Sequence, residues 1–236
     1  MELSCVWEHN GGDTLLYAVE LPGAYARGES LEAALTKMER EVRSYLLWRD
    51  GTAPDAVAVT VAQEAACELT VSDADSDVLF DAERPPLTRG EYKSLKALAL
   101  RSAADFLALY KSVPDPDRSV LPPRRTFYGA VPRTAREMLA HTQSVNSYYF
   151  AEIGVDADNG GTILSCRRAG FDALERQQDF LSNPVFDGSY GESWTLRKLL
   201  RRFLWHDRIH ARALLRMADR TFGPGTAADP FRFRQP

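Results

Sequence analysis

Cysteine and histidine are both scarce in this chain of 236 residues, which has three cysteines and four histidines. Cys5, Cys67 and Cys166 are odd in number, far apart and form no C-x-x-C pair. Such a set argues against a disulfide framework and against a thiolate zinc site. We expect all three to be reduced and buried, and a reactive thiol at Cys166 is the open alternative.

Long apolar runs and an excess of positive charge are also absent. No run approaches the roughly 18 to 20 apolar residues of a membrane span, and the start MELSCVWEHNGG has neither the basic nor the apolar region of a signal peptide. We therefore expect a cytoplasmic protein that does not bind a membrane. The net charge of −4 argues against a nucleic-acid partner, and the Arg-rich stretch 197–220 is interpreted as the solvated face of a helix.

The residues that are present divide the chain into two halves with different patterns. Residues 1–70 have a mixed α/β pattern, in which two β-favouring runs flank a Gly-Gly-Asp turn and predict a hairpin. Ser30 precedes apolar residues at helical spacing and predicts a helix N-cap. The run AVAVTVA at 56–62 predicts a third strand.

The segment TLLYAVELPGAYARGESLEAALTKMEREVRSYL, within residues 1–70, resembles the HicB-like domain. In that family a strand leads through a Leu-Pro-Gly turn and a Gly-Glu/Asp-Ser/Thr cap into a helix. The resemblance implies a small partner-binding or antitoxin module related to a degenerate nuclease fold. A generic strand–strand–helix unit is the alternative.

Residues 71–87 are predicted to form a polar linker. Asp73, Asp75 and Asp77 have the D-x-D-x-D spacing of a calcium loop, but Val and Arg occupy the positions where that loop requires Gly and Glu. Because ERPP combines charge with two prolines, we expect the two halves to be separable near residue 86.

The remainder of the chain has an almost purely helical pattern. Capping boxes at Thr88 and Thr134, each with Glu three residues later, predict the starts of two helices. Two further helices are predicted over about 165–181 and 193–220. We therefore predict an α+β fold, in which a four-helix bundle follows the N-terminal module. The predicted segments are the module at 1–70, the linker at 71–87, the bundle at 88–222 and a C-terminal tail at 223–236.

Two of the four histidines, His206 and His210, are one helical turn apart in LWHDRIHARALL. At about 100° per residue they lie in the middle of the apolar stripe of the last helix, so we expect both imidazoles to point into the protein. Arg197, Arg201 and Arg208 fall on the opposite side, where we expect solvent. The stripe consists of Leu196, Leu199, Phe203, Ala213, Leu214 and Met217.

His141 adds a third imidazole, on a face of another predicted helix that also carries Met138 and Val145, so it too is expected to point inward. Three nitrogens that leave coordination positions open are typical of a catalytic rather than a closed structural metal site. Neutral imidazole suits Zn, Ni, Fe, Cu or Co, and we favour one divalent zinc or nickel ion. Core histidines held by backbone or carboxylate groups are the alternative.

Helix geometry gives candidates for a supporting role. Glu137 and Arg202 lie one turn before His141 and His206 and could reach the site. A helix-cap residue and a surface cation are their alternative interpretations. Asp207 lies about 100° around the helix from His206 and is predicted to pair with a charge on a neighbouring helix.

At MLAHTQSVNSYYF, with His141, and WHDRIHARAL, with His206 and His210, the chain resembles the DinB-like superfamily, which includes YfiT-type proteins. The resemblance covers roughly residues 88–220: four helices, with one His on the second and H-x-x-x-H on the last. It implies a metal-binding bundle in which these three histidines are the ligands. Characterised members include thiol S-transferases that use low-molecular-weight thiols and a thiol-dependent isomerase, and many members have no known activity.

Three functions are open at this point. In the first, the metal activates a low-molecular-weight thiol, the cosubstrate, which attacks a small electrophile. In the second, the chain is a non-catalytic partner- or ligand-binding module, with a protein partner bound through residues 1–70. The third is a metal-dependent hydrolase. A homodimer is compatible with each. A small organic substrate is favoured over a nucleotide by the apolar wall expected beside the metal, formed by Val145, Tyr148, Tyr149 and Phe203.

Overall fold

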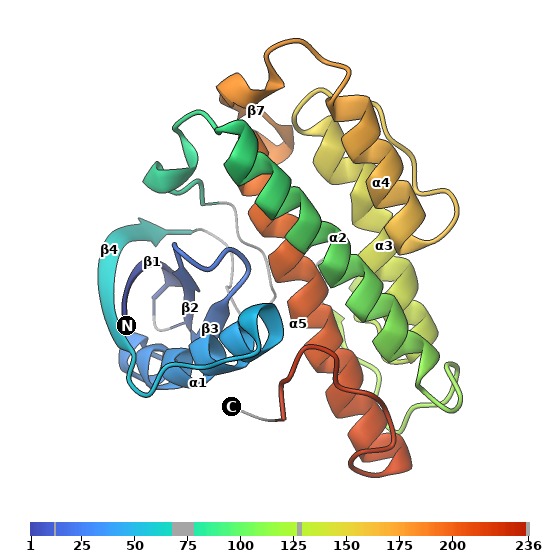
Figure 1. Cartoon of the computed structure of the whole chain (residues 1–236). Coiled ribbons are helices and arrows are strands. Elements are labelled where there is room, and N and C mark those ends of the chain that lie inside the picture. Colours follow the sequence, from blue (N-terminus) through green and yellow to red (C-terminus); the bar gives the residue numbers. More distant parts are fainter. Residues whose placement is uncertain (12, 68–77, 127–128, 235–236) are drawn as a thin grey trace.

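The β-favouring runs near the N-terminus form a mixed four-stranded sheet in the computed structural model, which describes residues 1–11, 13–67, 78–126 and 129–234 (Figure 1). The strand order is β3-β2-β1-β4, with β1 antiparallel to β2 and parallel to β4. The predicted hairpin is therefore confirmed, and the third predicted strand corresponds to β4. The short strand β3 was not predicted. The strands are β1 Glu2–Asn10, β2 Asp13–Ala18, β3 Tyr25–Gly28 and β4 Ala58–Ala66.

Helix α1, Leu31–Asp50, covers one face of this sheet. Its predicted cap is confirmed, because the Ser30 side chain accepts a hydrogen bond from the backbone N–H of Ala33 at 3.2 Å. The opposite face carries Tyr17, whose ring packs against those of Phe80 and Trp205. The sheet therefore lies between α1 and residues that follow β4 in the chain, Phe80 and Trp205 among them.

Four further helices pack against one another, so the fold class is α+β. The capping boxes predicted at Thr88 and Thr134 are both formed. The third of these helices ends at Leu174 rather than near residue 181, because the following RQQD offers no apolar residue to bury. No helix in the described part of the chain is long and apolar enough to cross a membrane. The bounds are α2 Arg89–Lys111, α3 Ala135–Ala151, α4 Ile163–Leu174 and α5 Leu196–Phe222.

Short elements occupy the connections between these helices. Two small hairpins lie in the α2–α3 and α4–α5 connections. Their strands are β5 Arg125–Thr126, β6 Gly129–Ala130, β7 Phe186–Asp187 and β8 Ser193–Trp194. In the described ranges, the 3-10 turns are η2 Asp81–Glu83, η3 Phe180–Ser182 and η4 Ser189–Gly191.

Helix α5 is buried on almost every side from its start to Arg208. Arg201 and Arg208, which we expected in solvent, are 2% and 0% exposed, and Arg197 is half-buried. The N-terminal module packs against the face that carries them. The predicted solvated face is wrong here, because the amphipathic pattern of one helix does not distinguish a charge that meets water from one that meets a buried carboxylate.

Carboxylates from the N-terminal part of the chain neutralise the buried arginines. Arg208 Nη2 donates to Glu41 Oε1 at 2.7 Å, and Arg212 pairs with the other carboxylate oxygen. Arg201 Nε donates to Glu83 Oε1 at 2.5 Å. Each pair joins α5 to an element that precedes α2, so α5 is the common packing partner of both halves.

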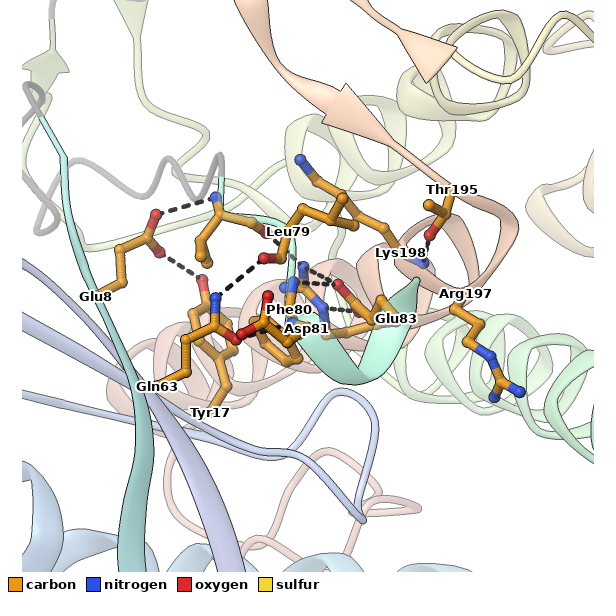
Figure 2. Close-up of polar contacts among 12 residues, drawn as sticks. Glu8, Tyr17, Gln63, Leu79, Phe80, Asp81, Glu83, Thr195, Arg197 and Lys198 are labelled. Carbon is orange, nitrogen blue, oxygen red and sulfur yellow. Dashed lines mark hydrogen bonds and ion pairs between the residues drawn. The ribbon is translucent and has the colours of Figure 1, made fainter. Parts of the chain in front are cut away.

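The described part of the predicted linker, residues 78–87, is fixed in place rather than free (Figure 2). The backbone N–H of Val78 donates to the Glu8 carboxylate at 3.3 Å, and the Gln63 amide donates to the carbonyl of Leu79 at 3.1 Å. The apolar side chains at its start are buried. The prediction of a polar linker is therefore wrong for this part. Outside the described residues lie the three aspartates at D-x-D-x-D spacing, Asp73, Asp75 and Asp77.

The apolar core also crosses the predicted boundary at ERPP. One cluster contains Leu16 of the sheet, Phe106 of α2 and Leu214 of α5. In the Leu-Pro-Gly turn, Gly23 has φ 92°, and a Cβ added there would lie 2.6 Å from Cβ of Leu204. Glycine is needed at that position for both reasons. Independent folding of the two halves stays a prediction, and these are the contacts that either half would lose.

The three cysteines are free thiols in this fold. Cys5 and Cys166 are buried as predicted, whereas Cys67 is half-buried. Burial, followed by the charge of Glu20, raises the pKa of Cys5 to about 12. Burial also raises the pKa of Cys166, which does not favour a reactive thiolate there.

The contribution of the α5 ion pairs to the stability of the fold can be tested with Glu41→Gln, which keeps the side-chain shape and removes the charge. Burial alone would raise the pKa of Glu41, but the charges and hydrogen bonds of Arg208 and Arg212 outweigh it and lower the pKa. We expect the free energy of unfolding to fall by about 3 kcal/mol, because Arg208 stays buried without its counter-charge. Urea denaturation measures the change.

Glu39→Gln is the matched control on the same helix. Its carboxylate is 52% exposed and pairs with Arg43 at 2.9 Å, so its loss should change the free energy of unfolding by less than about 1 kcal/mol. Similar losses for Glu39→Gln and Glu41→Gln would contradict the role given to the buried pair.

Candidate metal centre

Helices α3 and α5 bring the three predicted histidines together. The ring centroid of His141 lies 5.2 Å from that of His206 and 4.5 Å from that of His210. The rings of His206 and His210 are 4.4 Å apart. One nitrogen from each residue lies within 4.8 Å of the other two. The three imidazoles are therefore a cluster in space, from helices far apart in the sequence.

Burial decreases across the cluster. His206 is only 6% exposed, His210 is half-buried and His141 is exposed. His141, which we expected to point inward, does face the other two rings, but it lies at the solvent side of the cluster. The arrangement has an interior end and an accessible end, as a site for a small ligand requires.

The environment holds all three imidazoles in their neutral form. Burial lowers the pKa of His206 well below its ordinary value, and repulsion from a proton on His210 or His141 would lower it further. Burial, followed by the charge of His141, lowers the pKa of His210 to about 3. Desolvation lowers the pKa of His141 as well. Neutral imidazole is the form that binds a transition metal, so no proton has to leave before a metal binds at neutral pH.

The residues predicted to form an apolar wall lie on the interior side of His206. The ring of Tyr149, which is 2% exposed, has its centroid 6.0 Å from that of His206. Phe203 and Tyr148 contact Tyr149, with centroid separations of 5.3 and 5.6 Å. Val145 packs against the apolar core cluster that contains Tyr149 and Phe203. Of these four residues, Tyr149 is the one whose ring contacts that of His206, and Tyr148 and Phe203 pack against Tyr149.

Arg202 lies beside the cluster, but its environment differs from that of a surface cation. It is 3% exposed, and its guanidinium carbon is 5.0 Å from the ring centroid of Trp205 and 5.3 Å from that of Tyr149. Its charge contributes to the low pKa of His206. A fixed positive charge therefore stands near the buried end of the site.

The other two residues singled out in the sequence have structural positions. Glu137 accepts hydrogen bonds from the backbone N–H groups of Arg133 and Thr134, so it caps α3, which was the alternative interpretation. Asp207 pairs with Arg167 of α4 at 2.5 and 3.0 Å, and both side chains are fully buried. The predicted pairing of Asp207 with a neighbouring helix is confirmed.

Sequence reasoning missed Arg27, at the end of β3. Its charge is one of the causes that lower the pKa of His210. No periodicity or motif relates β3 to α5, and the pairing depends on the sheet packing against α5. Such a long-range neighbour leaves no signal in a single sequence.

The three imidazole nitrogens could together hold a divalent transition metal. Within the described residues, Nδ1 of His206 is buried without a hydrogen-bond partner. A buried polar nitrogen normally has a partner, and a metal ion would supply one. Three nitrogens and no thiolate suit Zn, Ni, Cu, Co or Fe rather than Mg or Ca.

Comparison with known proteins assigns no relative to this chain. No protein-family model matches it, and neither a curated protein nor a solved structure matches it significantly. The site is therefore interpreted from its own geometry.

The low pKa values of His206 and His210 can be tested through the pH dependence of stability in metal-free protein. Below about pH 6.5 the unfolded chain protonates His206 and His210, whereas the folded chain keeps them neutral, so stability must fall as pH falls toward 4. The slope is up to about 1.4 kcal/mol per pH unit for each such histidine. Urea denaturation of wild type and His210→Gln in chelator, between pH 7.5 and 4.5, should give a shallower slope for the variant. Equal slopes would contradict the low pKa of His210.

Proposed function

We propose that His141, His206 and His210 hold one divalent transition metal, zinc or nickel, in a DinB-like helical bundle. The observation that carries the proposal is the convergence of three neutral imidazoles from two helices, with ligand atoms within 4.8 Å of one another. Three protein ligands leave coordination positions for a cosubstrate. The partly open end of the cluster at His141 gives a small molecule access to those positions.

The arrangement of elements supports the proposed family likeness. The first His lies on the second of four packed helices and the H-x-x-x-H on the last, as in the DinB-like pattern. At the other end of the chain, the Leu-Pro-Gly turn leads through β3 and the Ser30 cap into α1, as the HicB-like pattern requires. We therefore propose a HicB-like module fused to a DinB-like bundle.

The proposed activity is transfer of a low-molecular-weight thiol to a small electrophile. The bound metal would lower the pKa of the thiol and present it as a thiolate. In the transfer, the sulfur forms a bond to the electrophilic carbon, the leaving group departs with the electrons of the bond that breaks, and the thiol proton passes to solvent. Tyr149 and Phe203 keep the interior end of the site dry, and the charge of Arg202 favours an anionic sulfur nearby.

Metal content tests the first part of the proposal. The purified full chain should carry close to one zinc or nickel ion per chain, and His206→Ala should lose it. His9→Ala is the control, because His9 lies in β1, stacked on Trp7 and paired with Glu64, outside the cluster. Elemental analysis measures both. Metal-free wild type that cannot be reloaded would contradict the metal site.

Thiol binding tests the second part. Cobalt-substituted protein should change its visible absorption when 2-mercaptoethanol, cysteine or glutathione is added, and His210→Ala should abolish the change while His9→Ala keeps it. The same proteins are then assayed for thiol transfer to 1-chloro-2,4-dinitrobenzene, with and without metal.

The alternatives give different results in this assay. An unchanged spectrum together with a stable protein partner recovered through residues 1–70 would replace the transferase with a binding module. Metal-dependent cleavage of p-nitrophenyl acetate without thiol dependence would indicate a hydrolase.

A further inference from the structure

A cavity of about 580 Å³ lies where β3 and α1 of the N-terminal module meet α5 and the C-terminal segment. In Figure 1 the C-terminal segment turns back from the end of α5 toward α1 and borders this region. We propose that the cavity binds a small organic polyanion, and that the phosphate or carboxylate groups of this ligand contact the cations of the cavity. This proposal does not rest on the metal centre or on the thiol chemistry.

The cavity has a large excess of cationic side chains. Two carboxylates, those of Glu41 and Asp219, also line it. Both carboxylates already form ion pairs, Glu41 with Arg208 and Arg212, and Asp219 with Arg234. In a chain of net charge −4, such a local concentration of positive charge is unusual. The six cations are Arg27, Lys37, Arg40, Arg212, Arg216 and Arg234.

Two of these cations are available to a ligand. Within the described residues, neither Arg40 nor Arg216 has a hydrogen-bond or ion-pair partner, and both are exposed at the cavity. Partial burial and the charges of Arg212, Arg220 and Arg27 lower the pKa of Arg216. An anion would relieve this repulsion, and guanidinium groups bind phosphate and carboxylate in bidentate fashion.

The remaining lining of the cavity is partly apolar, which indicates that the ligand carries a carbon skeleton as well as its anionic groups. The rings of Tyr25 and Phe233 and the side chains of Ile209 and Leu215 supply apolar surface. The volume lies in the range of about 300 to 1,000 Å³ that is typical of small-molecule sites. A bare inorganic ion would leave the apolar part of this lining unused.

The cavity is distinct from the histidine cluster. At 100° per residue, Arg212 lies about 200° around α5 from His210, so the two sites use opposite faces of the helix. None of the clustered histidines lines the cavity. Arg27 is the link, because it lines the cavity and its charge also acts on His210.

The cations come from four separate elements, which has a consequence for stability. Arg27 belongs to β3, Lys37 to α1, Arg216 to α5 and Arg234 to the C-terminal segment. A bound anion would contact several of them at once and hold these elements together. Ligand binding should therefore raise the unfolding temperature of the full chain, in addition to giving a heat signal in calorimetric titration.

The test is calorimetric titration of the full chain with phenyl phosphate and with phthalate, at one ionic strength set with sodium chloride, with phenol as the uncharged control. We expect one site for at least one dianion and none for phenol. Preference between the two dianions identifies phosphate or carboxylate as the recognised group. The double variant Arg40→Ala/Arg216→Ala should weaken binding by on the order of 10-fold or more.

The control double variant is Arg168→Ala/Arg176→Ala, which removes two exposed cations in and after α4, away from the cavity. It should change the affinity less than about 2-fold, and thermal unfolding shows whether both variants are folded. Equal weakening in the two double variants, or no binding of either dianion by wild type, would overturn the proposal. His206→Ala should keep binding. Loss of binding in that variant would place the anion at the histidines instead.

Discussion

Buried charge pairs on α5 fix the position of this helix. Arg201, Asp207 and Arg208 are all buried, and each is matched by an opposite charge from a different element: the segment before α2, helix α4 and helix α1. An unmatched buried charge costs several kcal/mol. Very few rotations and axial positions of α5 satisfy all three pairs together, so the directions of His206 and His210 are set with it.

The third imidazole, that of His141, is held less tightly by its surroundings. His141 comes from α3 and is exposed, whereas His206 is enclosed among Tyr149, Trp205 and its own helix. Two imidazoles on one fixed helix form the preorganised part of the cluster. His141 is the most exposed of the three rings, so it has the most room to adjust when an ion or a cosubstrate arrives.

The local features of the structure could be predicted from the sequence, whereas of the long-range ones only the meeting of His141 with the histidines of α5 and the pairing of Asp207 were foreseen. The caps at Ser30, Thr88 and Thr134 follow from hydrogen bonds within a few residues, and the pairing of His206 with His210 follows from helix periodicity. The burial of Arg201 was missed, because a charged residue is buried only if a distant carboxylate meets it. The segment 78–87 was missed for a similar reason, since its partners lie on the sheet and on α5, far away in the sequence.

The place of α5 along the chain has a consequence for how the protein is made. The sheet, α1 and α2 leave the ribosome long before α5, yet the arginines that match the charges of Glu41 and Glu83 belong to α5, and α5 also covers part of the apolar surface near them. Synthesis proceeds at about 5 to 20 residues per second. The N-terminal module therefore keeps this surface uncovered while the residues between it and α5 are synthesised, and its packing is completed only once α5 has been made.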